Sequence, residues 1–109
     1  MEAHERFAAL VETFATVPGV QLPDGRRRFG SAALKAGGSI FAMLTDDRLV
    51  VKLPAERVES LIASGDGAAF DASKGRPMKE WLTVVDDDDW VPLAQEALEY
   101  AEARGLRFR

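Results

Sequence analysis

Residues 31–53 read SAALKAGGSIFAMLTDDRLVVKL, and no other stretch of the chain says as much about its fold. Runs rich in apolar residues are separated twice by residue pairs that favour tight turns, Gly37-Gly38 and Asp46-Asp47. Two-residue turns of this kind join antiparallel strands in β-hairpins. The stretch therefore predicts three consecutive antiparallel strands, over about 31–36, 39–45 and 48–53.

If both turns contain two residues, the register between the strands is fixed, so that Met43 faces Val50 and Phe41 faces Leu34. One face of the three strands then carries Ile40, Ala42, Leu44, Leu49, Val51 and Leu53. The other face carries Leu34, Phe41, Met43 and Val50, together with the aliphatic stem of Lys52. In an antiparallel sheet with one solvated face, apolar and polar residues alternate along each strand more regularly than they do here. We therefore expect the second face to have a covering, a partner or a ligand. As a contact surface, it would be a homodimer interface or a groove that binds a partner.

Outward from these strands, the spacing of apolar residues predicts three helices, over about 3–16, 54–63 and 90–104. Two more short strands are expected over about 68–71 and 78–85, where aromatic and β-branched residues gather. The region 21–30 is polar and is expected to form a loop. The order is helix, three strands, helix, two strands, helix. It predicts a single α+β domain over residues 1–109, with a five-stranded antiparallel sheet and helices packed on it in two layers.

Composition excludes several kinds of chemistry. The chain has 109 residues and no cysteine, which excludes disulfide scaffolds, thiolate metal sites and cysteine nucleophiles. Its first residues lack the pattern of a signal peptide, and no apolar run approaches the ~20 residues that cross a bilayer. We expect a cytoplasmic protein with no membrane partner.

Three motifs suggest chemistry but have simpler explanations. His4 is the only histidine and lies near a terminus, where a catalytic base cannot be held rigidly. The acidic run Asp86–Asp89 precedes a predicted helix, where aspartate caps the helix and favours its dipole. Residues 65–67 (GDG) and 73–75 (SKG) do not match the glycine patterns of nucleotide-binding loops. We predict no catalytic residue, no metal site and no cofactor.

Basic residues form two local clusters in a chain whose net charge is −4: Arg26, Arg27 and Arg28 in one, and Lys74, Arg76 and Lys79 in the other. Such clusters can neutralise nucleic-acid phosphates, although a net negative protein is repelled by a polyanion at long range. Trp81, close to the second cluster, offers a stacking surface. These seven residues are the candidate contacts for a partner or for nucleic acid.

Residues 70–84 (FDASKGRPMKEWLTV), with 39–44 (SIFAML) and 48–54 (RLVVKLP), resemble the small bacterial TfoX N-terminal-domain-like proteins of the TfoX/Sxy family. These proteins are related in fold to the MmcQ/YjbR group of CyaY-like domains. The resemblance extends from about Phe7 to Gly105, and its most specific part is the KGRPM segment. It implies a two-layer α-β-β-β-α-β-β-α domain, and it supplies no catalytic residues. Full-length TfoX/Sxy proteins regulate natural competence and carry a C-terminal domain beyond the third helix, whereas YjbR-like relatives are often described as DNA-binding.

Three hypotheses about function follow. The first is a non-enzymatic binding or regulatory module, which uses the Leu34, Phe41, Met43 and Val50 face with the segment 74–81 at its rim. The second is a DNA-binding protein that uses the two basic clusters. The third is an enzyme whose carboxylates act as acid and base in a pocket, because isolated carboxylates form no recognisable motif.

Overall fold

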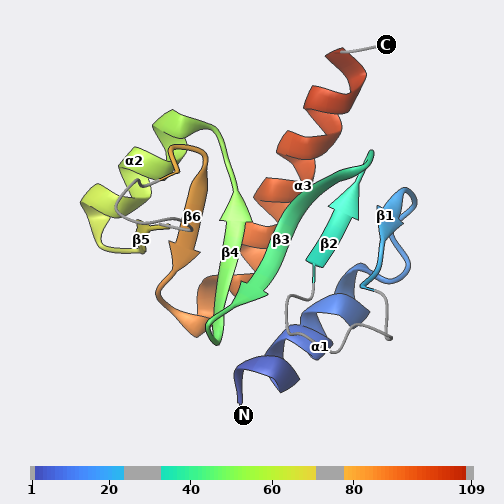
Figure 1. Ribbon diagram of the computed structural model, residues 1–109, viewed down its shortest axis with the longest axis horizontal. Coiled ribbons are helices and arrows are strands. Elements are labelled where there is room, and N and C mark those ends of the chain that lie inside the picture. Colours follow the sequence, from blue (N-terminus) through green and yellow to red (C-terminus); the bar gives the residue numbers. More distant parts are fainter. Residues whose placement is uncertain (1, 24–32, 71–77, 108–109) are drawn as a thin grey trace.

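A computed structural model of the chain describes residues 2–23, 33–70 and 78–107. In this part of the chain the fold is α+β, with three α-helices and one six-stranded antiparallel sheet of order β1-β2-β3-β4-β6-β5 (Figure 1). The strands are β1 (Val20–Gln21), β2 (Ala33–Ala36), β3 (Ser39–Thr45), β4 (Arg48–Lys52), β5 (Gly67–Ala69) and β6 (Trp81–Val84). The helices are α1 (Ala3–Phe14), α2 (Ala55–Ser64) and α3 (Trp90–Arg107), the last preceded by a 3₁₀ turn, η1 (Asp87–Asp89).

The helix ends follow local rules. Helix α2 starts directly after Pro54 and ends at Gly65, whose φ of 87° is the left-handed conformation common at helix C-termini. Before α3, the Asp86 carboxylate accepts a hydrogen bond of 2.9 Å from the backbone N–H of Asp88. This contact confirms the capping role expected for the acidic run. Helix α3 continues to Arg107, past its expected end near 104, so Gly105 does not terminate it.

The hydrophobic core lies between the helices and one face of the sheet. Ring centroids of Phe14 in α1 and Phe41 in β3 are 5.8 Å apart in an edge-to-face arrangement. The other large core residues include Leu10, Leu34, Leu49, Val51, Leu53, Leu61, Leu82, Val84, Trp90 and Leu98. Helix α3 lies against β3 and β4, and α2 lies beside β5 and β6 at one side of the sheet (Figure 1).

The register between β3 and β4 is the predicted one. Met43 pairs with Val50 and Thr45 pairs with Arg48. The turn residues Asp46 and Asp47 both have positive φ, of 51° and 62°, as a two-residue hairpin turn with the correct twist requires.

The register between β2 and β3 differs from the prediction. Lys35 pairs with Ile40, but beyond an irregularity at Leu34/Lys35 the pairing shifts, so that Leu34 faces Ala42 instead of Phe41. Phe41 is therefore the extra residue of a β-bulge. Bulges of this kind leave no trace in a count of turn residues, which is why the assumption of an unbroken ladder failed.

The bulge corrects the predicted second face. Leu34 and Phe41 are both 0% exposed and belong to the core on the helix side of the sheet, so they do not share a surface with Met43 and Val50. Val50 lies between two core residues of β4, and Met43 pairs with it, which leaves these two side chains on the opposite face. Val50 is 1% exposed and Met43 is half-buried. The four residues therefore do not form one apolar contact surface.

The sheet also has one strand more than predicted. Val20 pairs with Ala36 and Gln21 pairs with Lys35, at the start of the predicted loop 21–30 and just before it. Gly19, with a φ of 86°, turns the chain back toward β2. A strand of two residues is too short to show the alternation from which strands are predicted. Among the described residues, no helix is long and apolar enough to cross a membrane.

Candidate functional site

The predicted contact residues fall mostly outside the part of the chain that the structure describes. Arg26, Arg27, Arg28, Lys74 and Arg76 all lie there. The remaining two are close together: Lys79 is exposed, and Trp81 is half-buried at the start of β6.

Near Trp81, whose ring contacts the lining residue Lys52, a hollow of about 210 Å³ opens between the C-terminal half of α3 and the end of the sheet that carries the β2–β3 turn. We call it the basic hollow. Its lining residues are Gly37, Ser39, Ile40, Lys52, Ala97, Tyr100, Ala101 and Arg104. It is thus lined by two cations, one phenol and a set of small or apolar side chains.

One carboxylate, that of Glu80, connects the polar residues of the basic hollow. The Tyr100 hydroxyl donates a hydrogen bond of 2.9 Å to Oε2 of Glu80. Oε1 of Glu80 lies 3.5 Å from a guanidinium nitrogen of Arg104 and 4.0 Å from Nζ of Lys52. Segments far apart in sequence, the end of β4, the residue before β6 and the last turns of α3, therefore meet around one negative charge.

Aromatic rings hold both cations of the basic hollow. Nζ of Lys52 lies 5.5 Å from the centre of the Trp81 ring, and the two residues are cross-strand partners in the β4–β6 ladder. The guanidinium carbon of Arg104 lies 5.4 Å from the centre of the Tyr100 ring, one helical turn earlier in α3. Both distances fall within the ~6 Å range of cation–π attraction. The Trp81 ring also packs against Phe70, at 6.5 Å between centroids.

The environment of Tyr100 favours its neutral form. Partial burial raises the pKa of the phenol, and the hydrogen bond to Glu80 and the charge of Glu80 raise it further, against a smaller opposing effect of Arg104. The hydroxyl therefore stays protonated and keeps donating to Glu80 throughout the physiological pH range.

Lys52, Glu80, Tyr100 and Arg104 were not predicted as site residues from the sequence. The i, i+4 spacing of Tyr100 and Arg104 places them on one side of α3, which could have been recognised. Nothing local connects them with Lys52 or Glu80, because those contacts arise only from the packing of α3 on the sheet. The prediction came close through Lys79 and Trp81, which flank Glu80 in the sequence.

A second hollow, also of about 210 Å³, lies between α2 and the N-terminal half of α3. We call it the acidic hollow. Its lining residues are Arg57, Leu61, Asp66, Asp89, Pro92, Leu93 and Glu96. Arg57 makes a two-pronged contact with Glu96, with nitrogen–oxygen distances of 2.9 and 3.0 Å.

The carboxylates of the acidic hollow affect one another. Partial desolvation raises the pKa of Asp89, and the charges of Asp86, Asp66 and Asp88 raise it further. The Asp66 carboxylate accepts a hydrogen bond of 2.8 Å from the Ser64 hydroxyl. If carboxylates perform acid–base chemistry in the acidic hollow, Asp66, Asp89 and Glu96 are the residues available there, and Arg57 already holds Glu96.

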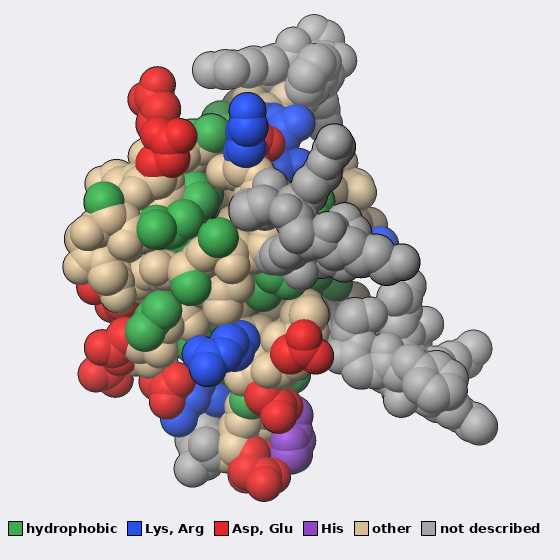
Figure 2. All heavy atoms as spheres, turned by 60° about the vertical axis from the view of Figure 1, so that its left-hand side comes forward, with side chains coloured by type: hydrophobic (Ala, Val, Ile, Leu, Met, Phe, Trp, Pro, Cys, Tyr) green, Lys and Arg blue, Asp and Glu red, His purple; other side chains and the backbone are tan. Residues whose placement is uncertain are grey.

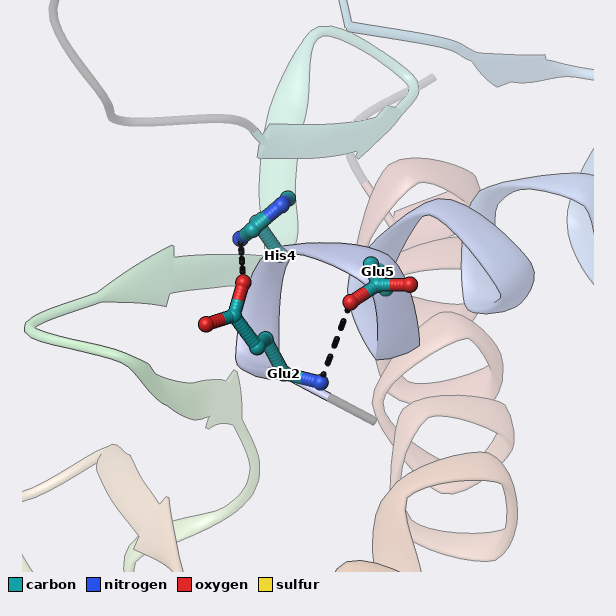
Figure 3. Close-up of side chains that lie close together, drawn as sticks. All are labelled: Glu2, His4 and Glu5. Carbon is teal, nitrogen blue, oxygen red and sulfur yellow. Dashed lines mark hydrogen bonds and ion pairs between the residues drawn. The ribbon is translucent and has the colours of Figure 1, made fainter.

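A third group of titratable side chains, Glu2, His4 and Glu5, lies at the start of α1 (Figure 3). Their ligand atoms lie within 4.8 Å of one another, and all three residues are exposed. The Glu5 carboxylate accepts from the backbone N–H of Glu2 at 3.4 Å, which is half of a capping box, and Nδ1 of His4 lies 3.7 Å from the Glu2 carboxylate. The two carboxylates therefore serve the helix terminus.

Charge is patchy over the described surface. On the side shown in Figure 2, the Lys and Arg side chains fall into separate groups with acidic side chains beside them, not into one continuous basic patch. Near the start of α1, for example, Arg6 contacts the Asp87 carboxylate at 3.2 Å and lies over the Trp90 ring.

Comparison with known proteins finds no matching family model, no matching curated protein and no matching solved structure.

Proposed function

We propose that the chain is a non-enzymatic binding or regulatory module of the TfoX N-terminal-domain-like type, and that the basic hollow is its ligand site. The observation that carries this proposal is the convergence of Lys52, Tyr100 and Arg104 on one hollow with a partly apolar lining. Concave sites of this composition, mostly apolar with a few convergent polar groups, are where proteins bind small groups.

The rest of the basic hollow fits binding better than catalysis. Its polar side chains are those of Lys52, Arg104, Ser39 and a phenol kept neutral, and beside it lies the Glu80 carboxylate, already bonded to that phenol. General acid–base catalysis needs a group whose pKa lies near the working pH. The neutral phenol of Tyr100 titrates above that range, so it acts here as a fixed hydrogen-bond donor.

The proposal is tested by two-dimensional NMR titration with a panel of small organic acids, amines, amides and sugars. We expect at least one class to give saturable shifts at the backbone amides of Gly37, Ser39, Tyr100 and Arg104. Ala101→Leu places a larger apolar side chain in the basic hollow without changing charge, and it should abolish those shifts while the circular-dichroism spectrum stays native. If no probe perturbs these amides at millimolar concentration, the basic hollow is not a ligand site.

We propose DNA binding as the second candidate function, which one further observation favours: Lys79, the described member of the second basic cluster, is exposed. Fluorescence anisotropy with a labelled duplex should then show an affinity that falls steeply with salt. Lys79→Glu should weaken binding and reduce the logarithmic salt slope by about one unit for each phosphate that the variant no longer neutralises. The double variant Lys74→Glu/Arg76→Glu tests the rest of the predicted cluster. An affinity that does not depend on salt would contradict this candidate.

A further inference from the structure

We propose that the basic hollow binds a small organic acid that carries one negative charge and an apolar body, and that this acid shares Lys52 and Arg104 with Glu80. The inference rests on the proposed function, because it names the ligand class of the same site.

The charge of the ligand follows from the groups that meet at the basic hollow. Two cations, Lys52 and Arg104, surround one carboxylate, Glu80, and one net positive charge is left. A single additional negative charge neutralises this set. A cationic ligand would repel both Lys52 and Arg104 in a partly desolvated space, where charges interact more strongly than in water.

The geometry leaves room for a second anion. Glu80 approaches Arg104 only to 3.5 Å and Lys52 only to 4.0 Å, whereas charge-assisted hydrogen bonds between such groups are about 2.7–2.9 Å long. The short bond of Glu80 is the 2.9 Å contact with the Tyr100 hydroxyl. An incoming carboxylate can therefore form the close contacts with the two cations that Glu80, held by Tyr100, does not form.

The cations are held in place for such a ligand. Lys52 lies over the Trp81 ring and Arg104 over the Tyr100 ring, at 5.5 and 5.4 Å from the ring centres. Their side chains are 26% and 39% exposed, so each charge is partly withdrawn from water and still accessible. Holding a charged group in position before binding reduces the entropy that binding costs.

The size and the lining of the basic hollow define the rest of the ligand. Ile40, Ala97 and Ala101 present apolar surface beside the cations. The volume, about 210 Å³, lies below the roughly 300–1,000 Å³ of sites for drug-sized ligands. A single ring or a short branched chain attached to a carboxylate fits this description.

Benzoate is a suitable probe, and its relatives separate the two features of the ligand. Benzamide keeps the ring without the charge, benzylamine reverses the charge, and acetate and inorganic phosphate keep an anion without the ring. In the NMR titration, we expect benzoate to shift the amide signals of the basic hollow saturably and to bind about tenfold more tightly than each other probe. A tenfold difference in affinity corresponds to roughly one charge-assisted contact or a few buried carbons.

Charge-removing variants identify the residues responsible. Arg104→Gln and Lys52→Gln should each weaken benzoate binding by about tenfold, since each removes one cationic partner. Glu80→Gln should strengthen binding several-fold, because it removes the carboxylate that shares the same cations. Glu96→Gln is the matched control, since it removes one carboxylate from the acidic hollow and none from the basic hollow. It should leave benzoate binding unchanged.

The results separate failure of this inference from failure of the proposed function. If benzamide or benzylamine binds in the basic hollow as well as benzoate does, the hollow is a ligand site but not one for anions. If phosphate or acetate equals benzoate, the apolar body plays no part, and if Glu80→Gln weakens binding, Glu80 does not share its cations with the ligand. Each of these results overturns the inference, whereas no binding of any probe overturns the proposed function itself.

Discussion

The basic and acidic hollows are built on the same helix with opposite charge. Toward the C-terminal half of α3, one carboxylate, Glu80, sits among Lys52, Arg104 and the Tyr100 hydroxyl. Toward its N-terminal half, one cation, Arg57, sits among carboxylates and binds Glu96 with two close contacts. The volumes are alike, so volume does not distinguish them.

The difference lies in how well the central charge is bound. Arg57 and Glu96 satisfy each other at 2.9 and 3.0 Å, whereas Glu80 stays 3.5 Å or more from both of its cations. A closed ion pair leaves little for a ligand to gain, whereas cations that lack a close partner can gain one from a ligand. Helix α3 therefore carries one hollow in which the charges form a structural contact and one in which they are available for binding.

The largest effect is expected from Gly67→Ala, next to Asp66 of the acidic hollow. A Cβ at Gly67 would lie 2.7 Å from Cγ of Leu82, a side chain that is 0% exposed and cannot move aside freely. Overpacking of this kind costs about 1–3 kcal/mol, and displacement of β5 would move the adjacent Asp66. Urea denaturation measures the cost.

Two further variants control this experiment. Ala69→Ser, at an exposed position of the same strand, should be close to neutral. Adding Leu82→Ala to Gly67→Ala should recover part of the stability relative to the sum of the single changes, because it removes the atoms that clash. Additive effects would mean that the close approach of Gly67 to Leu82 is not the cause.

A smaller effect is expected from Tyr100→Phe, which removes the bond that holds Glu80 in the basic hollow. Loss of a partly buried hydrogen bond costs about 0.5–1.5 kcal/mol. The folded pKa of Tyr100 is raised, so its contribution to stability is present below the unfolded value of about 10 and is lost as pH rises through the folded value. Above about pH 10, the free energy of unfolding of the wild type should therefore fall more steeply with pH than that of Tyr100→Phe.

Because Tyr100 is the only tyrosine of the chain, tyrosinate absorbance reports this one group directly. Its midpoint in the folded protein should exceed that of the urea-unfolded chain. Glu80→Gln should lower the folded midpoint, because it removes the negative charge that disfavours the phenolate. Gly67→Ala should leave it unchanged, since Gly67 pairs with Val84, at the end of β6 opposite to Glu80. Equal midpoints in folded and unfolded chains would show that Tyr100 is not held by Glu80.

A still smaller effect is expected from Arg57→Gln, about 0.2–1 kcal/mol, because Arg57 and Glu96 are both more than one-third exposed. The remaining carboxylates of the acidic hollow then repel one another, so added salt should restore part of the lost stability. Thermal denaturation in low and high salt tests this expectation. The double variant Arg57→Gln/Glu96→Gln should be less destabilised than the two single changes together, and strict additivity would argue against a coupled pair.

Local signals in the sequence were enough for the three helices and five of the strands, but not for β1 or for the basic hollow. The β3–β4 hairpin follows from Asp46-Asp47, and the cap of η1 follows from Asp86, because in both cases a few neighbouring residues determine the conformation. The bulge at Phe41 accompanies a long-range contact, in which the ring packs edge-to-face against Phe14 of α1. An extra residue in one strand reverses the expected face of every position beyond it, which is how Leu34 came to be assigned to the wrong surface.

The difference between local and long-range signals also explains which site residues the sequence could indicate. Lys79 and Trp81 were identified because they follow one another closely in a basic and aromatic segment. Lys52, Glu80 and Arg104 are ordinary surface charges in the sequence, and only the position of α3 across the sheet brings them together. Charge clusters that form through tertiary packing carry no local pattern, so a structure is needed to see them.

The smallest effect is expected from Asp89→Asn, and its sign is informative. The pKa of Asp89 is raised, first by partial desolvation and then by Asp86, Asp66 and Asp88, so its ionised form is disfavoured in the folded state. The stabilising contribution of the protonated group is present below its unfolded pKa and is lost as pH rises through the folded value, near and above pH 4. The variant should therefore melt at a slightly higher temperature than wild type at pH 7, and at the same temperature as wild type near pH 3.

Asp46→Asn, at an exposed aspartate in the β3–β4 turn, is the matched control and should show no gain that depends on pH. A lower melting temperature at pH 7 would mean that the position of Asp89 at the start of α3, where the helix dipole favours negative charge, outweighs repulsion within the acidic hollow.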